Sequence, residues 1–554
     1  MNLKRPIKIV VIVLIAALTI FSIGISIYMF PSRYNYTIPN RLVVAVSNGP
    51  STIDPQDALD SASANVLDNC LEGLYAYNLS DPNLPIIPRL ASAMGTWSGD
   101  NYTVPLRQDV TFQDGSVFTS ADVVWSFNRL MNLMSLGKAT AAELYKVYVP
   151  SINDTINIIN RVVANGPYSV TFVLNTTYGP FVPLLCFEGS MIMKADSEPV
   201  DNNIDLLTGS LVGTGPWIYK SYETGVQVTF DAYKNYWRGA PHFNQLIFDV
   251  IPDSNARDIV MLAGDTDIYL TPSQSLLSTY NTTSGLVLKR VGSNLATSYL
   301  GMNNKLIPVN IRKAISYALD YSSILTDVFK GSGYRMNSPI PKGITFSNYS
   351  FNVATYNITI ARQAMQSEFP STAPSDVQDD NSWKNITLAT YNYTYPKGDS
   401  IREKIYNILF DNLGAVGIKV EKASTSWTNY ENMLLELDGK SRNDLGLFWM
   451  DWSPTNYLGT YDYLNPLITN RTLASNYAQV NDSQVQSWME QAVKETNSTI
   501  QQVLYNKIQK RLVEEVYPWA FGFTGVNYDV WKSDIHGFSS NAMDKAYFYP
   551  CYRS

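Results

Sequence analysis

The sequence is short of charge, histidine and cysteine, and each shortage argues against a class of function. Its 554 residues include only 16% charged side chains and carry a net charge of -7. Such a chain lacks the basic face that binds nucleic acid. Only two histidines occur, His242 and His536, which argues against a histidine-based catalytic triad or a histidine-rich metal site. The three cysteines, Cys70, Cys186 and Cys551, fit no zinc spacing. We expect buried thiols rather than one disulfide and a thiol left over.

The length and the hydrophobic pattern predict an α/β protein of several domains. A chain of 554 residues is too long for one ordinary core, so two or three domains are expected. Strand-like and helix-like periods alternate along the chain, which indicates α/β architecture. The absence of internal repeats argues against a repetitive surface-layer or adhesion protein. The low density of charge would suit an acidic exterior, where carboxylates lose their charge.

The N-terminal segment, residues 1–34, predicts a basic cytoplasmic tip followed by a membrane anchor. A largely apolar run covers residues 9–30, and about 20 residues of helix cross a bilayer. Lys4, Arg5 and Lys8 precede the run, so the positive-inside rule keeps them in the cytoplasm and places the rest of the chain outside. A cleaved signal peptide is the alternative. We favour an uncleaved anchor, because the run is long for a signal peptide and no small-x-small cleavage site is obvious after it.

Potential N-glycosylation sites are frequent, which also fits an extracellular location. In a chain rich in Asn and Thr many such triplets arise by chance, so they indicate a glycoprotein only if the chain is secreted by a cell that glycosylates. The N-x-S/T triplets begin at Asn35, Asn78, Asn101, Asn153, Asn175, Asn281, Asn348, Asn357, Asn385, Asn392, Asn470, Asn481 and Asn497.

The stretch FQDGSVFTSADVVWSFNRL, residues 112–130, predicts scaffold rather than chemistry. Asp114-Gly115 is a turn signal, because glycine tolerates positive φ. Thr119 with Asp122 three residues later resembles a capping box. The stretch contains no nucleophile, metal-ligand cluster or phosphate loop. Apolar residues follow the cap on one helical face: Val123, Phe127 and Leu130.

Residues 481–516 predict two helices joined near Asn497. The apolar positions of the second helix recur at helical spacing, which is typical of a face that packs on the core. The residues expected to lie toward the core are Val503, Ile508, Leu512 and Val513.

Five stretches resemble, in order, the motifs of one protein family. The second resembles the signature F-x-L-R-x-x-V-x-F-x-D-G-x-x-F-T-x-x-D-V, and the third resembles the GTGPY and YW-x-G-x-P elements. One stretch would be weak evidence, but five in family order are specific. On these residues the chain is identified as a member of the solute-binding proteins of ABC importers, family 5, which bind oligopeptides and dipeptides. The stretches are residues 51–77, 102–130, 213–222 with 235–241, 299–320 and 504–538.

The resemblance implies a two-lobed, type II periplasmic-binding-protein-like α/β fold with an additional inserted domain. The chain would cross between the lobes, and the lobes would close on a ligand about a hinge. The stretch 112–130 would then help to build the extra domain that enlarges the cleft. Lobe one would comprise residues 41–78, 205–295 and 518–554, the inserted domain residues 79–204, and lobe two residues 296–517.

The resemblance also implies ligand-binding residues. Peptide binders of the family hold the α-ammonium group of the ligand with an aspartate of lobe two, and the matching stretch here, residues 445–458, contains Asp451. Trp449 and Trp452 flank it and would wall a side-chain pocket. Asn303 would make a polar contact near the hinge. The alternatives are a turn or helix-cap aspartate for Asp451 and a core position for Trp449.

The implied function is the capture of oligopeptides or dipeptides outside the cell and their delivery to ABC permease subunits in the membrane. The protein would be a monomer without enzymatic activity, cofactor or metal. Oligosaccharide binding by the same fold is the alternative, since aromatic rings also stack on sugars, although Asp451 favours peptides. An anchored hydrolase with two carboxylates about 5–10 Å apart is a further alternative. No local motif marks such a pair.

Overall fold

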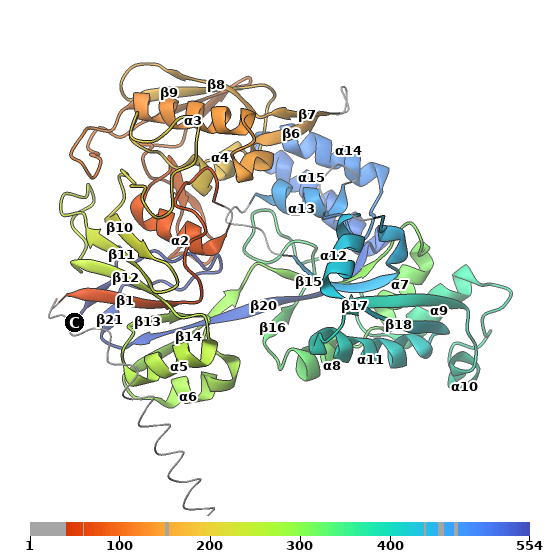
Figure 1. Cartoon of the computed structure of the whole chain (residues 1–554). Helices are drawn as coiled ribbons and strands as arrows, with labels where there is room; N and C mark the ends of the chain where they lie inside the picture. The colour runs from red at the N-terminus through yellow and green to blue at the C-terminus, as the bar shows by residue number, and fades with distance from the viewer. Residues whose placement is uncertain (1–39, 59, 150–153, 437–438, 453–458, 470–474) are drawn as a thin grey trace, which may run out of the picture.

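Two lobes share one twelve-stranded sheet, and the strand β20 (Trp519–Lys532) runs from one lobe into the other (Figure 1). The structure is a computed structural model that describes residues 40–58, 60–149, 154–436, 439–452, 459–469 and 475–554. Within these ranges no helix is both long and apolar enough to cross a membrane. The segment expected to form the anchor, residues 9–30, lies outside them, so the anchor stays a prediction.

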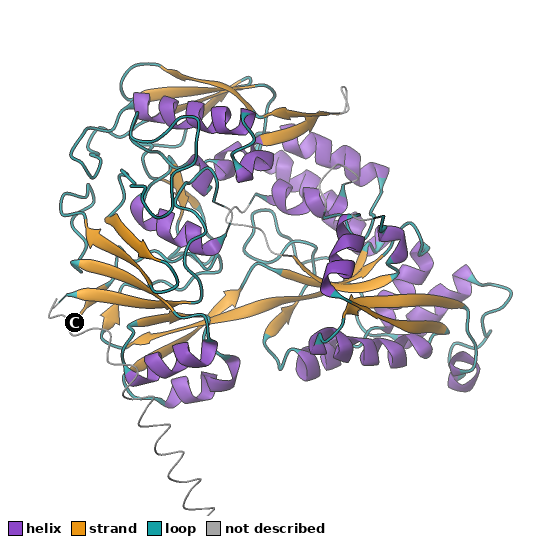
Figure 2. Ribbon diagram, viewed as in Figure 1, coloured by secondary structure: helices purple, strands orange, loops and turns teal. Residues whose placement is uncertain are grey.

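Lobe one is a mixed sheet with a parallel centre and helices packed beside it (Figure 2). The strand β1 pairs in parallel with β12 and with β13, and β10 and β11 continue the sheet in antiparallel order. The inner residues of β1 are all buried, as expected for a strand covered on both faces. The elements are β1 (Arg41–Val46), β10 (Trp217–Glu223), β11 (Gln227–Ala232), β12 (Gln245–Val250), β13 (Ile268–Leu270), β14 (Leu286–Ser293), α2 (Ser61–Cys70), α5 (Ser254–Ala263) and α6 (Leu277–Thr282).

Lobe two repeats this plan on the other half of β20. The strand β15 pairs with both β20 and β19, and β17 runs parallel to β18 and β19. The strands are β15 (Thr297–Met302), β16 (Gly333–Arg335), β17 (Ala389–Pro396), β18 (Ile418–Thr425) and β19 (Leu447–Trp452). The helices are α7 (Val309–Ala318), α8 (Tyr321–Ser323), α9 (Ile358–Glu368), α10 (Asp380–Lys384), α11 (Ser400–Gly414), α12 (Trp427–Leu435), α13 (Thr460–Ile468), α14 (Ser483–Lys494) and α15 (Ser498–Arg511).

A separate four-stranded sheet and the helix α3 (Ser120–Ser135) form a third unit. Its sequence-based local predictions are confirmed. The side chain of Thr119 caps α3, the Asp122 carboxylate accepts from the Thr119 N–H at 2.8 Å, and Gly115 has a φ of 87°. The apolar face is buried at Val123, Phe127 and Leu130.

The strands of the third unit are β4 (Thr96–Ser98), β5 (Asn101–Pro105), β8 (Ile159–Ala164) and β9 (Ser169–Leu174). Three short strand pairs lie outside this sheet: β2 (Tyr75–Tyr77) with β3 (Ile86–Pro88), β6 (Lys146–Val149) with β7 (Asp154–Asn157), and β21 (Ile535–His536) with β22 (Tyr552–Arg553).

The two helices expected between residues 481 and 516 are present as α14 and α15. Asn497 caps α15 by accepting hydrogen bonds from the N–H groups of Thr499 and Ile500. The prediction for Val503 is wrong, because its side chain lies beside the exposed Ile500 and is itself 49% exposed. The other predicted core residues, Ile508, Leu512 and Val513, are buried.

A buried ion pair ties the third unit to lobe one. The Arg129 guanidinium, from α3, lies 2.6 Å from a carboxylate oxygen of Asp54, and both side chains are fully buried. Arg129 also donates to Gln56 and to the carbonyl groups of Pro199 and Asn202. A buried charge pair is tolerated when its remaining donors are satisfied, as they are here. The pair therefore joins the third unit firmly to lobe one.

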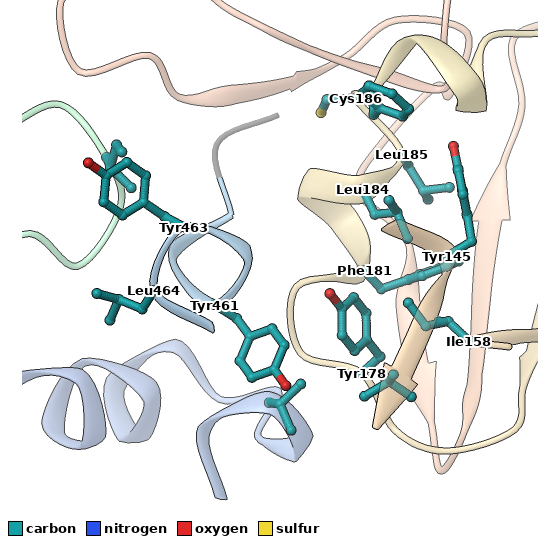
Figure 3. Packing of buried hydrophobic residues seen from close by; sticks show 14 of the residues in the cluster. Tyr145, Ile158, Tyr178, Phe181, Leu184, Leu185, Cys186, Tyr461, Tyr463 and Leu464 are labelled. Carbon is teal, nitrogen blue, oxygen red and sulfur yellow. The ribbon is translucent and has the colours of Figure 1, made fainter. Parts of the chain in front are cut away.

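The third unit also contacts lobe two. The Gly179 N–H donates to the Val493 carbonyl at 2.6 Å, and the rings of Tyr178 and Tyr461 meet edge to face at 6.2 Å. Figure 3 shows the Tyr461 side chain of α13 pointing toward Tyr178. A Cβ atom on Gly179 would lie 2.2 Å from the Glu495 carbonyl oxygen. This close approach requires glycine.

All three cysteines are free and buried, as expected from the sequence. Burial raises the pKa of the Cys70 and Cys186 thiols, and raises that of Cys551 to about 12.

Glu198 makes the stability of the fold depend on pH. Burial raises its pKa from 4.5 to about 7; the Arg129 charge opposes this rise and the Asp54 charge adds to it. The folded state therefore holds the proton more tightly than the unfolded chain, and stability falls as pH rises from 4.5 to about 7. We expect Glu198→Gln to remove this fall and to raise the free energy of unfolding at pH 7.5 by about 1 kcal/mol, after allowance for partial hydration.

Urea unfolding at pH 5 and pH 7.5 measures the effect of Glu198→Gln. The exposed Glu223 provides the control variant Glu223→Gln, which should keep the pH dependence of the unsubstituted protein. The same dependence in Glu198→Gln would contradict the prediction.

Candidate functional site: the cleft at the hinge strand

The strand β20 makes the carboxyl ends of the parallel strands of both lobes face each other. In lobe one, β13 ends opposite Asp529, and the Thr271 N–H donates to the Tyr528 carbonyl. In lobe two, Ser298 pairs with both Phe523 of β20 and the last part of β19. Phe523 and Tyr528 are five positions apart on β20, roughly 17 Å of extended chain. Ligands of open α/β sheets bind outside the carboxyl ends of the strands, so this crevice is the candidate site.

A cavity of about 560 Å³ forms the lobe-one side of the crevice. It is lined by the end of β1 and residues 47–51, by Leu270 and Thr271 after β13, and by the first half of α2. Its volume is within the usual range of small-molecule sites, about 300–1,000 Å³. A Cβ atom at Gly49 in this lining would lie 2.2 Å from the Tyr222 hydroxyl, so a larger residue there would displace the Tyr222 ring.

Two carboxyl groups line this cavity, Asp60 and Asp544. Asp60 caps α2 and accepts hydrogen bonds from Ser51 and Ser63. Burial alone would raise the pKa of Asp60, but these hydrogen bonds outweigh it and lower the pKa. Asp544 is open to the cavity yet surrounded by protein, which limits its hydration. That enclosure and the Asp529 carboxylate raise the pKa of Asp544 to about 7.

Asp451 lies on the opposite side of the crevice, next to the last residue of β19. Its carboxylate accepts a hydrogen bond from the Ser298 hydroxyl, and the side chain is 56% exposed. The nearest cation is Arg402, at 3.7 Å. Arg402 is already bound to the Asp399 carboxylate, and its Nε donates to the Trp449 carbonyl at 3.0 Å. Asp451 is therefore held in place while its carboxylate remains open to solvent.

Comparison with known proteins gives the same family along most of the chain. The model of the bacterial extracellular solute-binding proteins, family 5 (middle region), matches residues 85–474. The chain belongs to this family. It is thus a solute-binding protein of ABC transporters.

Relatives and solved structures agree with this assignment. Heme-binding protein A of Haemophilus influenzae is 25% identical over 441 residues, which cover 76% of this solute-binding protein and 75% of the relative. Oligopeptide-binding protein AppA of Bacillus subtilis is 24% identical over 520 residues, covering 90% and 88%. The structure of HbpA2 from Haemophilus parasuis superposes with a TM-score of 0.76 at 20% identity, covering 93% and 100%. The two-lobed fold expected from the motifs is therefore confirmed, while the relatives' names differ in ligand.

The other residues proposed for the ligand site of this solute-binding protein are buried or partly buried. Trp449 is 1% exposed and packs against Phe329 at 6.0 Å in the core of lobe two. Trp452 is partly buried at the crevice end of β19. Asn303 is fully buried, and its amide donates to the carbonyl groups of Arg442 and Leu445. The last part of the predicted stretch, residues 453–458, lies outside the described residues.

Several residues of the crevice were not found from the sequence. Asp60 precedes a helical pattern, so its cap was a readable signal. Arg402 and Asp544 carry no motif, because only the fold brings them to the crevice. Among the described residues no three histidine, cysteine or carboxylate side chains are grouped so as to hold a metal ion.

The contact at Gly179 should control how the lobes sit about the crevice. We expect Gly179→Ala to break the hydrogen bond to Val493, since the added methyl group collides with the Glu495 carbonyl. The radius of gyration from solution X-ray scattering should then increase. Gly414, whose Cβ position is empty within 4 Å, gives the control Gly414→Ala, for which no change is expected. An unchanged radius in Gly179→Ala would show that the contact does not restrain the lobes.

Proposed function

We propose that this protein captures oligopeptides or dipeptides in the crevice beside β20 and delivers them to an ABC permease. The observation that carries the proposal is the carboxylate of Asp451, fixed by Ser298 and exposed where the two lobes meet. A peptide presents one cationic α-ammonium group at its N-terminus, and an ionised carboxylate is the partner that forms strong, charge-assisted hydrogen bonds with it. The relative AppA, named as oligopeptide-binding, supports the choice of peptide.

The proposed binding site uses the other predicted residues in supporting roles. Trp452 would form an apolar wall beside the ligand, and Trp449 would pack behind the strand that carries Asp451. Asn303 would fix the loop between Arg442 and Leu445. Arg402 would keep the carboxylate in place without neutralising it, because its own charge is directed to Asp399.

Capture would proceed by closure of lobe two on lobe one together with the third unit. A ligand that touches both lobes favours the closed arrangement by its higher affinity for that arrangement. The long strand β20 and its neighbours would absorb the rotation. An N-terminal anchor, residues 1–34, would hold the protein near its permease and raise its effective concentration there.

Asp451→Asn tests the role of Asp451 in the peptide site. We expect free-N-terminus peptides to bind about tenfold to a hundredfold more weakly, because the charge of the carboxylate is lost while its shape is kept. N-acetylated peptides, which lack the ammonium group, should bind the variant and the unsubstituted protein alike. Isothermal titration calorimetry on a matched peptide pair measures both.

The matched control for Asp451→Asn is Asp231→Asn. Asp231 is 47% exposed and 3.4 Å from Lys220, but lies at the amino end of the lobe-one strands. The control should leave both affinities unchanged. Equal weakening of free and acetylated peptides by Asp451→Asn would remove the assigned role.

The anchor proposal predicts that the mature protein retains its N-terminus. Mass spectrometry of the membrane-bound protein should find the peptide with Lys4 and Arg5, and deletion of residues 1–30 should release the protein from membranes. A mature chain that begins near residue 31 would mean a cleaved signal peptide.

A further inference from the structure

The turn at residues 541–545 presents Asp544 to the lobe-one cavity. Asn541 is 8% exposed, and its amide donates to the Lys545 carbonyl at 2.8 Å. The Asn541 side-chain oxygen accepts from the N–H groups of Met543 and Lys545. These bonds close a tight loop with Asp544 at its tip.

The same turn is fastened to helix α2, which lines the cavity. The Lys545 ammonium lies 3.0 Å from Asp68 and 2.5 Å from Glu188. The Asn65 side chain accepts from the Ala546 N–H at 3.0 Å. Asp544 therefore keeps a fixed position relative to the cavity wall.

The backbone at Asp544 is left-handed, with a φ of 56°. Aspartate and asparagine adopt this conformation more readily than other residues with a side chain, so an aspartate suits the turn. No hydrogen bond or ion pair engages the Asp544 side chain within the part of the chain that the structure describes. The carboxylate therefore remains available to a ligand in the cavity.

A second carboxylate strengthens the negative charge at this place. Asp529, on β20, is 2% exposed and interacts electrostatically with Asp544. One Asp529 oxygen accepts from the Ser540 hydroxyl. The other is buried and has no hydrogen-bond donor among the described residues. A buried carboxylate oxygen without a donor favours a cation nearby.

The two cations nearest the Asp544 turn are directed away from Asp544. Arg257, which lines the cavity, is 9% exposed, donates to the carbonyl groups of Ile251 and Pro252, and lies over the Tyr269 ring. Lys545 is bound to Asp68 and Glu188. Lys289 is opposite Asp529 in the register of β14 and β20, and its charge opposes the rise in the pKa of Asp529, but its side chain is exposed and is not part of the cavity lining.

We propose that Asp544, reinforced by Asp529, binds a cationic side chain of the ligand, so that the protein prefers peptides with a lysine or arginine beyond their first residue. The inference rests on the proposed peptide function and names its substrate class. Asp451 on β19 and the cavity at the ends of β1 and β13 lie on opposite sides of β20, so the two sites are further apart than the roughly 17 Å along β20. An extended pentapeptide covers about that length, and a long lysine or arginine side chain supplies the remaining reach. The α-ammonium group of the peptide would then contact lobe two at Asp451, and its cationic side chain would contact lobe one at Asp544.

The experiment compares pentaalanine with pentapeptides that carry lysine, or the neutral isostere norleucine, at positions two to five. Affinities are measured by calorimetry on the full-length chain in detergent at pH 8, above the Asp544 pKa of about 7. At one or more positions lysine should bind about tenfold to a hundredfold more tightly than norleucine. The variant Asp544→Asn should lose this preference while it still binds pentaalanine, because asparagine tolerates the left-handed backbone.

Asp196→Asn is the matched control. Asp196 is also left-handed, with a φ of 59°, and lies outside the cavity lining, so its variant should keep the preference for lysine. Binding of pentaalanine without any preference, or a preference that survives in Asp544→Asn, would overturn the inference and leave the peptide function standing. Failure of every peptide to bind the unsubstituted protein would overturn the peptide function itself and this inference with it.

Discussion

The continuity of β20 is the constraint from which the functional geometry follows. One strand of fourteen residues belongs to both halves of the sheet, so it joins the two lobes directly. Because β13 and β19 end toward its middle from opposite sides, the ends of both sets of parallel strands face one crevice. The carboxyl groups of Asp451 and Asp544 reach that crevice from lobes far apart in sequence. The strand directions therefore point to this crevice as the candidate place for the solute.

The third unit adds a second connection, and the two connections differ in chemistry. Toward lobe one it is held by the Arg129–Asp54 pair, which is fully buried and satisfied. Separating such a pair would leave a buried charge without its partner, so this joint is rigid. Toward lobe two it makes a backbone hydrogen bond at Gly179 and ring contacts such as Tyr178 with Tyr461. The buried residues of the third unit and lobe two also form one continuous hydrophobic cluster, so this joint rests on apolar packing rather than on charge.

The sequence predicted what depends on near neighbours in the chain. The cap at Thr119 and Asp122 and the helix boundary near Asn497 each depend on residues a few positions apart, and the structure confirms both. Each family motif was also readable, because it is a short stretch of the chain. The sequence could not predict contacts made by folding. Val503 was assigned to the core from its helical spacing but lies on the exposed face of α15. Helical spacing shows which residues share a face of a helix, but not which face the rest of the protein covers. Asp544 has no local signal, since its neighbours Asp529 and α2 come from distant segments.

The three thiols have a consequence for the chemistry that the protein can tolerate. Reactivity toward oxidants requires the thiolate, and burial keeps Cys70, Cys186 and Cys551 protonated and out of contact with solvent. A protein of an extracellular family can thus carry an odd number of cysteines without cross-linking to its neighbours. Because the native thiols are buried, maleimide dyes would not label them. A pair of cysteines introduced on opposite lobes could therefore be labelled selectively, and fluorescence from the two dyes would measure the distance between the lobes.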